Sequence, residues 1–321
     1  MKIALDVMGG DYAPVELLAG AVKWLQESEG QIVLVGDREI INEELHQHSY
    51  DPSRLEVVHA SQVIGMNESP AAALRKKKDA SIVVASRLVK DGIADAVVSC
   101  GSTGAQMAAA IFILGRMEGV ERPPIVAAIP GRGGKQTLLI DVGANVDCRP
   151  LQLVQFALLG QAYARGVLNL DNPRVGLLNN GEEEGKGNSL SIQAYELLSG
   201  QSGLNFVGNI EGRDLFSSRC DVIVCDGFTG NILLKALEGV VFFLAAGVKE
   251  DLGTIPATFA RLDYTQIGGA PLLGVNGISV VCHGSSRREA VCNGLNIAAD
   301  SINNNIVDKQ LQELARLKMQ N

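Results

Sequence analysis

Glycine beside acidic, amide or hydroxyl side chains recurs where short apolar runs of this chain end. The first instance is segment 6–11, Asp-Val-Met-Gly-Gly-Asp, which follows the apolar run 3–5. Glycine lets a backbone approach a ligand closely, and a helix that starts there directs unpaired N–H groups at an anion. The candidate residues here are Asp6, Gly9, Gly10 and Asp11. A purely structural turn would look much the same, so both interpretations stay open.

A second corner of this kind is segment 99–105, Ser-Cys-Gly-Ser-Thr-Gly-Ala. Its part 101–104 brings two hydroxyls and two glycines directly before an apolar helical pattern over 106–114, so Ser102, Thr103 and Gly104 are candidate anion ligands. A favourable charge–dipole contact contributes about 0.3–1 kcal/mol, so several such groups must act together. The alternative is a capped helix start without a ligand.

Segment 182–188, Glu-Glu-Glu-Gly-Lys-Gly-Asn, is unusually charged for a loop between a strand and a helix. Lys186 lies between two glycines and could reach a phosphate as a mobile cation. The neighbouring acids could carry protons or hold Lys186 in place. A solvated loop is the competing interpretation.

His283 follows another apolar strand pattern and precedes Gly284 and Ser285. Histidine titrates near neutral pH, which suits proton transfer or contact with phosphate. The same strand-end pattern places Asn145, Asp226 and Asn231 at candidate positions. A lone histidine is more often structural, but its position at a strand end favours a functional role.

A basic run follows Ser69 and Pro70. Arg75, Lys76, Lys77 and Lys78 put four positive charges on one predicted helical turn of an otherwise acidic chain. Such a cluster is usually a solvated face. In this chain it could dock an acidic partner and accelerate their encounter.

The elements that would position these residues alternate between strands and helices. Strand patterns occur at 2–7, 31–36, 55–58, 95–99, 125–129, 137–142, 174–178, 205–210, 221–225 and 278–283. The alternation predicts an α/β fold with a doubly wound, mainly parallel sheet, whose ligands bind beyond the carboxyl ends of the strands. The link between 129 and 137 is too short for a crossover helix and predicts an antiparallel hairpin.

We expect one α/β catalytic domain over 1–321, with a helical excursion at about 232–267. The apolar stretch 232–248 inside it is interrupted by Lys235 and Glu238, and its longest uncharged part is about half of the roughly 20 residues that a membrane span needs. A buried helix or a helix at a subunit interface is the favoured interpretation, and contact with a membrane surface is the secondary one.

Composition excludes several classes of protein. The net charge of −8 and 4% aromatic residues argue against nucleic-acid binding. The six cysteines are scattered without C-x-x-C pairs, which favours reduced thiols in a cytoplasmic protein over a metal site. The first strand end lacks the complete G-x-G-x-x-G fingerprint of dinucleotide-binding proteins. We expect no signal peptide, no metal and no cofactor.

Taken together, the motifs resemble a known family. In family order they are 6–11, 69–78, 101–105, 139–145, 177–187, 226–231, 268–274 and 283–285. The chain resembles the bacterial phosphate acyltransferases called PlsX from its first residues to about residue 305. The resemblance implies a fold similar to the isopropylmalate and isocitrate dehydrogenases and phosphotransacetylase. It also implies a homodimer and loose association with the inner face of the cytoplasmic membrane.

The resemblance further implies that acyl-acyl-carrier-protein and inorganic phosphate become acyl phosphate and free carrier protein, an early step of phospholipid synthesis. Two departures from the family stand out: Ser102 replaces the usual asparagine, and the stretch from 231 to 268 is shorter than in relatives. The alternatives are a short-chain phosphotransacetylase that uses coenzyme A, or a catalytically silent scaffold for acyl carriers or membranes.

Our mechanistic hypothesis is direct attack of phosphate on the thioester. Gly9, Gly10, Lys186 and the loop 102–104 would hold the phosphate. A second group of residues would orient groups or handle protons: Asp6, Asn145, Asp226, Asn231 and His283. The basic run 75–78 would attract the carrier protein.

Overall fold

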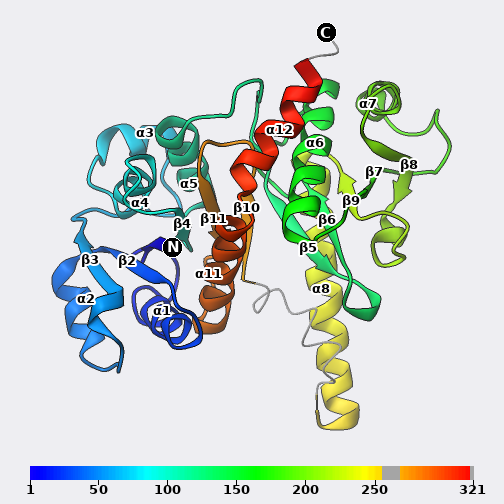
Figure 1. Cartoon of the computed structure of the whole chain (residues 1–321). Helices are drawn as coiled ribbons and strands as arrows, with labels where there is room; N and C mark the ends of the chain where they lie inside the picture. Colours follow the sequence, from blue (N-terminus) through cyan, green and yellow to red (C-terminus); the bar gives the residue numbers. More distant parts are fainter. Residues whose placement is uncertain (255–267, 319–321) are drawn as a thin grey trace. The chain divides into compact units, whose positions relative to one another are not determined.

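The computed structural model describes residues 1–254 and 268–318. The chain divides into two compact units, one of Met1–Arg116 with Tyr264–Asn303 and one of Met117–Asp263 with Asn304–Asn321. Each unit has its own sheet and its own helices (Figure 1).

The first unit contains a six-stranded sheet in the order β10-β11-β4-β1-β2-β3. Its strands are β1 (Lys2–Asp6), β2 (Gln31–Gly36), β3 (Leu55–His59), β4 (Ala96–Ser99), β10 (Gly269–Leu272) and β11 (Ile278–Cys282). Every neighbouring pair is parallel except β10 with β11. The central strands are short apolar runs that are buried on both faces, as parallel strands require.

Helices cover both faces of this sheet. They are α1 (Val15–Glu27), α2 (Arg38–Leu45), α3 (Pro70–Lys76), α4 (Ser81–Lys90), α5 (Thr103–Ala109) and α11 (Arg288–Asn303), with a short 3-10 turn at Pro52–Arg54. A π-helical turn, Ala110–Leu114, continues α5. Helices α1 and α11 pack together, whereas α4 contacts α5 and the strands β1, β2 and β4. The unit is therefore doubly wound.

The second unit contains a five-stranded sheet in the order β5-β6-β9-β7-β8. Its strands are β5 (Val126–Pro130), β6 (Gln136–Ile140), β7 (Arg174–Asn179), β8 (Asn205–Glu211) and β9 (Val222–Val224). Its helices are α6 (Pro150–Val167), α7 (Ser189–Ser199), α8 (Gly227–Leu252) and α12 (Ile306–Lys318), with 3-10 turns at Arg132–Gly134 and Gly212–Phe216. Strands β5 and β6 are antiparallel and the other pairs are parallel.

Helix α6 is the central helix of the second unit. It starts with Pro150 at its first turn, is buried over most of its length, and contacts β6, β9, α7 and α12. Gly160 allows this packing, because a Cβ at that position would lie 2.5 Å from Cδ1 of Ile140. The apolar side chains of α6 and of β6 thus form the core of the unit.

Helix α8 differs from the others because its apolar side chains face solvent. Phe242 and Phe243 are 76% and 75% exposed. In the described part of the chain, one helix, Gly227–Asp251, is long and apolar enough to cross a bilayer by length and composition. Exposed apolar side chains of this kind are more often covered by another surface than left in water.

The fold class and much of the local structure agree with the sequence predictions. The α/β class with parallel strands and the antiparallel hairpin at 125–140 are confirmed. The expected single sheet is wrong, because the strands form two sheets, and β10 was missed. Helix α8 accounts for the first part of the expected helical excursion, and residues 255–267 lie outside the described residues. That 1–321 acts as one catalytic domain stays a prediction.

The contact between α1 and α11 generates a stability prediction. A Cβ at Gly20 would lie 2.7 Å from Cβ of Val291 and 2.8 Å from the carbonyl oxygen of Arg288. We expect Gly20→Ala to lower the free energy of unfolding by about 1–3 kcal/mol, because the two helices must separate. Thermal and denaturant unfolding would measure the change.

Gly247 in α8 is the matched control, since no described atom lies within 4 Å of a Cβ built there. Gly247→Ala should instead raise the stability by roughly 0.5–1 kcal/mol through helix propensity alone. Equal effects of the two substitutions would contradict the close packing of α1 on α11.

Candidate functional site

Three strand ends meet in the first unit. Strands β1, β4 and β11 are parallel neighbours, and Ser99 of β4 is paired with both Asp6 of β1 and Val281 of β11. The loops that follow these strands therefore leave the same edge of the sheet. These loops are 7–11, 100–104 and 283–286, and each carries residues that the sequence singled out.

Glycine makes the close approach of these loops possible. A Cβ at Gly9 would lie 2.7 Å from Cα of Gly101, and one at Gly10 would lie 3.1 Å from the carbonyl oxygen of Cys100. Gly10 also has a φ of +113°, which disfavours other residues. The Asp11 N–H donates to the carbonyl oxygen of Gly284 at 2.8 Å. The three loops thus form one connected backbone surface.

Asp6 is a buried carboxyl group at the base of this surface. Its Oδ2 accepts from the Ser99 hydroxyl at 2.8 Å, and its Oδ1 accepts from the Met8 N–H at 3.2 Å. Burial raises the pKa of Asp6, and hydrogen bonds from Ser81, Ser99 and the backbone oppose part of that rise. A buried carboxyl group with a raised pKa is typical of residues that handle protons.

A small hollow lies beside Asp6. Its lining includes the hydroxyl residues Ser81, Ser99 and Ser102. Its volume of about 10 Å³ suits a single water-sized group. A phosphate is larger, so it would contact the mouth of the hollow instead of its interior. Ser102 stands at that mouth and caps α5, because its Oγ accepts from the Ala105 N–H at 3.4 Å.

His283 is exposed at the end of β11. Its Nδ1 accepts from the Ser285 N–H at 3.2 Å and lies 2.7 Å from the Ser285 Oγ. In the neutral ring the proton therefore belongs on Nε2. Ser285 thus orients the imidazole, as expected for a histidine that exchanges protons.

The second unit has a corresponding carboxyl group in Asp141, directly after β6. Its Oδ1 accepts from the N–H groups of Ile125 and Ala144 at 3.0 and 3.1 Å, and its Oδ2 accepts from the Asn145 N–H at 2.7 Å. Burial raises the pKa of Asp141, as it does for Asp6. This side chain organises the loop 142–145.

The loop after β9 locks onto the loop that Asp141 organises. The Gly227 N–H donates to the carbonyl oxygen of Asn145 at 2.7 Å, and a Cβ at Gly230 would lie 1.9 Å from the carbonyl oxygen of Asp141. Asn145 is itself buried and donates its amide hydrogens to Pro123 and Asp141. The structure thus gives Asn145 an orienting contact.

Asp226 and Asn231 lie at the start of α8. Asp226 caps the helix, since its Oδ1 accepts from the Thr229 N–H at 2.8 Å. The Asn231 side chain lies 3.5 Å from where a Cβ of Gly143 would be, which places it against the loop of Asp141. Asn145, Asp226 and Asn231 are therefore brought together.

Lys186 lies on an exposed loop after β7. Among the described residues, no carboxylate is within ion-pair distance of its Nζ. The Asn179 side chain fixes the loop by donating to the carbonyl oxygen of Lys186 at 2.9 Å. The expectation that the neighbouring acids hold Lys186 is wrong, because Glu182 binds arginines and Glu184 accepts from Tyr195.

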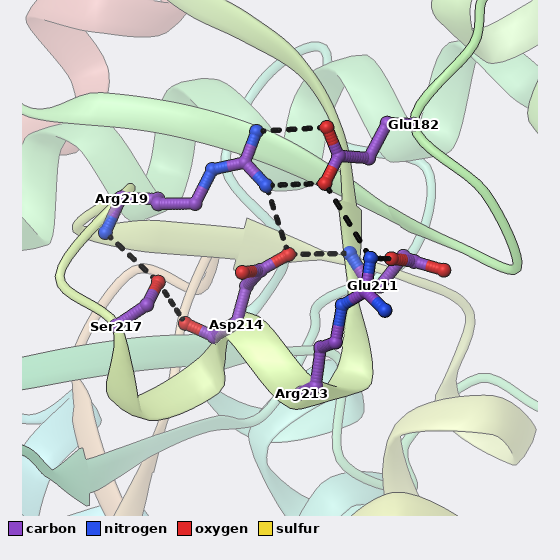
Figure 2. Close-up of polar contacts among 6 residues, drawn as sticks. All are labelled: Glu182, Glu211, Arg213, Asp214, Ser217 and Arg219. Carbon is purple, nitrogen blue, oxygen red and sulfur yellow. Dashed lines mark hydrogen bonds and ion pairs between the residues drawn. The ribbon is translucent and has the colours of Figure 1, made fainter.

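Figure 2 shows the ion pairs at the base of this loop. The guanidinium of Arg219 contacts both oxygens of Glu182, at 2.7 and 3.3 Å, and also Asp214 at 3.1 Å. Arg213 pairs with Glu211. Hydrogen bonding to Arg219 lowers the pKa of Glu182. The three carboxylates lie close enough to hold a cation, but the two arginines already supply the positive charge.

The basic run differs from its prediction. Helix α3 ends at Lys76, so the four charges do not share one helical turn. Lys77 turns back and donates to Glu68 at 2.6 Å and to the carbonyl oxygen of Val63 at 2.7 Å. Arg75 and Lys78 are exposed and line a groove of the first unit.

Apart from the basic run 75–78, the predicted site residues thus form two groups, each within its own unit. The first contains Asp6, Gly9, Gly10, Asp11, Ser102, Thr103, Gly104, His283 and Ser285, and the second contains Asn145, Asp226, Asn231 and, on a separate loop, Lys186. The structure adds Ser81, Ser99, Asp141 and Arg219. The sequence carried one signal for Asp141, because an Asp-Val pair, 6–7 and 141–142, occurs at the carboxyl end of both apolar runs.

The fold is that of an α/β protein and is similar to the fold of phosphotransacetylases. A phosphotransacetylase from Streptococcus pyogenes superposes with a TM-score of 0.67, at 19% identity and 94% coverage of both chains. A 4-hydroxythreonine-4-phosphate dehydrogenase from Klebsiella pneumoniae gives a TM-score of 0.59, at 12% identity, with 94% of this chain and 99% of that chain covered. At these identities the likeness concerns the fold alone.

Comparison of sequences identifies the family. A family model described as fatty acid synthesis protein matches residues 1–309. The phosphate acyltransferase of Syntrophomonas wolfei is 65% identical over 318 residues, with 99% of each chain covered. That of Pelotomaculum thermopropionicum is 51% identical, with 96% of this chain and 93% of the relative covered. The chain belongs to this family, the PlsX phosphate acyltransferases, as the motifs indicated.

The burial of Asp6 generates a prediction for pH dependence. Because its pKa is raised from 3.8, the folded state holds the proton more tightly than the unfolded chain does. Its contribution to stability is therefore lost as the pH rises above 3.8 through the raised value. At pH 7 we expect Asp6→Asn to match or exceed the melting temperature of the wild type, and to reduce activity at least about tenfold.

The difference in melting temperature between Asp6→Asn and the wild type should shrink as the pH falls toward 3.8. Calorimetry at a series of pH values measures it. A variant that melts several degrees lower at pH 7 would show instead that the ionised carboxylate supports the fold.

Proposed function

We propose that this protein transfers an acyl group from acyl-acyl-carrier-protein to inorganic phosphate. The observation that carries the proposal is the 65% identity over the full chain to a protein named phosphate acyltransferase. The connected loops of the first unit support it, because they present backbone and hydroxyl donors around a buried carboxyl group. Such a surface suits a tetrahedral oxyanion.

The chemistry requires no covalent enzyme intermediate. A phosphate oxygen attacks the thioester carbonyl and forms a carbon–oxygen bond, and the carbon–sulfur bond then breaks. The thiolate leaves with the electron pair and takes up a proton. Phosphate is already a nucleophile at neutral pH, so the protein mainly positions it and stabilises the developing oxyanion.

Each group of residues has a proposed part in this reaction. Gly9, Gly10 and the loop 102–104 hold phosphate through backbone and hydroxyl donors, and Lys186 supplies a positive charge. Asp6 and His283 handle protons. Asp226 and Asn231 orient groups, and Asn145 does so from a buried position.

The product is an acyl phosphate that enters phospholipid synthesis, and we place the reaction in the cytoplasm, at the inner face of the cytoplasmic membrane. We further propose a homodimer in which α8 is the contact helix. The exposure of Phe242 and Phe243 supports this dimer, because burying such apolar side chains against a partner lowers the free energy.

The proposed function is tested by incubating the purified protein with phosphate and a panel of acyl donors. Long-chain acyl-carrier-protein should give a product that hydroxylamine traps, and the yield should depend on phosphate. A preference for short-chain acyl-coenzyme A would instead identify a phosphotransacetylase. Binding of the carrier protein without product from any donor would identify a silent scaffold.

Lys186→Ala should raise the half-saturating phosphate concentration about tenfold, because a charge-assisted contact to phosphate is lost. Lys186 is exposed, so the melting temperature should not change. Lys135→Ala, an exposed lysine in the turn between β5 and β6, is the control and should leave phosphate dependence unchanged. If Lys186→Ala has the same half-saturating phosphate concentration as the wild type, Lys186 does not hold phosphate.

The double variant Phe242→Asp/Phe243→Asp should dissociate the dimer. Burying two phenylalanines stabilises the dimer by roughly 3–6 kcal/mol, and this stabilisation is lost when aspartates replace them. Sedimentation velocity measures the change in mass. A double variant that remains dimeric would contradict the proposal. If that dimeric variant no longer binds anionic vesicles, α8 would be assigned to contact with the membrane.

A further inference from the structure

The first unit contains a groove that none of the proposed catalytic steps uses. It has a volume of about 520 Å³ and lies between α3, α4 and the π-helical turn that continues α5. Figure 1 shows α3, α4 and α5 gathered on one side of the first sheet. The floor is apolar, since it includes the buried side chains of Leu74 and Val83, and Phe112 stands at the rim with 67% of its surface exposed.

The rim of this groove is strongly basic. Arg75 and Lys78 come from α3 and the residues after it, and Arg87 and Lys90 come from α4. All four are exposed, and one acidic residue, Asp91, also lines the groove. Among the described residues, none of the four has a carboxylate within ion-pair distance. This concentration of positive charge contrasts with the 28 basic and 36 acidic residues of the chain.

The groove is also physically connected to the candidate phosphate loop. Helix α3 starts against that loop, because a Cβ at Gly104 would lie 2.7 Å from Cγ of Pro70. The other end of α3 supplies Leu74 and Arg75 to the groove. At about 1.5 Å per residue, Phe112 lies roughly 12–14 Å along the helix axis from Thr103. A flexible arm attached to a protein in the groove could span that distance.

We propose that this groove is the docking site for an acidic helix of the acyl carrier protein. The inference rests on the proposed function and specifies the partner surface for it. A concave apolar floor with a cationic rim fits the apolar edge and acidic face of an amphipathic helix. A lipid surface is flat and would favour a protruding apolar segment over a groove.

This assignment changes the interpretation of the basic run 75–78. Arg75 and Lys78 line the groove, whereas Lys77 is engaged by Glu68 and Lys76 is not among the lining residues. Arg87 and Lys90, which sequence spacing alone did not connect with the run, complete the rim. Arg87 also donates to the carbonyl oxygen of Lys78 at 3.0 Å, which ties the two sides of the rim together.

The test is charge reversal in the full-length protein. Arg87→Glu/Lys90→Glu should raise the KM for acyl-carrier-protein at least about tenfold and weaken its dependence on salt, mainly through slower association. The KM for phosphate and the kcat should stay unchanged. Lys135→Glu, which makes a comparable reversal at an exposed lysine outside the groove, should have no effect on the KM for the carrier.

Phe112→Ser supplies a second variant, chosen because its side chain is exposed and its loss does not threaten the fold. It should weaken carrier binding while leaving the salt dependence intact, since it removes apolar contact and no charge. An acyl donor without the carrier protein, such as acyl-pantetheine, should react equally with every variant.

Direct titration of labelled carrier protein separates the two possible failures. If wild type binds carrier and Arg87→Glu/Lys90→Glu does not, the groove is supported even when no acyl phosphate is formed, and only the proposed function fails. If Arg87→Glu/Lys90→Glu and Phe112→Ser both bind carrier protein as the wild type does, the docking site is refuted, and the proposed transfer reaction is unaffected. The docking site would also be refuted if Arg87→Glu/Lys90→Glu binds carrier protein normally but no longer binds anionic vesicles.

Discussion

The loops at the strand ends of both units are built around a buried carboxyl group. Asp6 and Asp141 are both out of contact with water, and both accept hydrogen bonds from the loop that follows. A buried carboxyl group without hydrogen-bond partners would be unfavourable, so the surrounding N–H and hydroxyl groups converge on it. That convergence forces tight loops, and the tight loops in turn require glycine at Gly9 and Gly230. The loops of the candidate sites are therefore shaped by the hydrogen bonds that they donate to these two acids.

Local features of the fold were predictable because they depend on neighbours in the sequence. The strands β1, β4 and β11 are continuous apolar runs, and such runs are buried wherever the chain places them. Pro150 at the first turn of α6 marked the start of that helix for the same local reason. The hairpin of β5 and β6 followed from the length of the connection alone.

Other features depend on contacts between distant residues, which spacing does not encode. Sequence alone placed the strands in one sheet, because nothing in an apolar run specifies which strand it will pair with. It also missed β10, a four-residue strand containing a proline. Proximity in the sequence suggested that the acids beside Lys186 could hold that lysine or carry protons, whereas Arg219, 37 residues away from Glu182, pairs with Glu182 in bidentate geometry. Arg87 and Lys90 join Arg75 and Lys78 only through the fold, because α4 and the end of α3 line the same groove.

The outermost strands of the two sheets have a consequence for how copies of this chain can associate. Pro271 interrupts the donors of β10, Pro130 closes β5, and a bulge at Gly208, where φ is +89°, breaks the register of β8. The fourth outer strand, β3, exposes Glu56 and His59. Each device spoils the row of free peptide groups that another polypeptide would need as a template. Self-association by strand addition at these four strands, and with it growth into fibrils, is thereby discouraged.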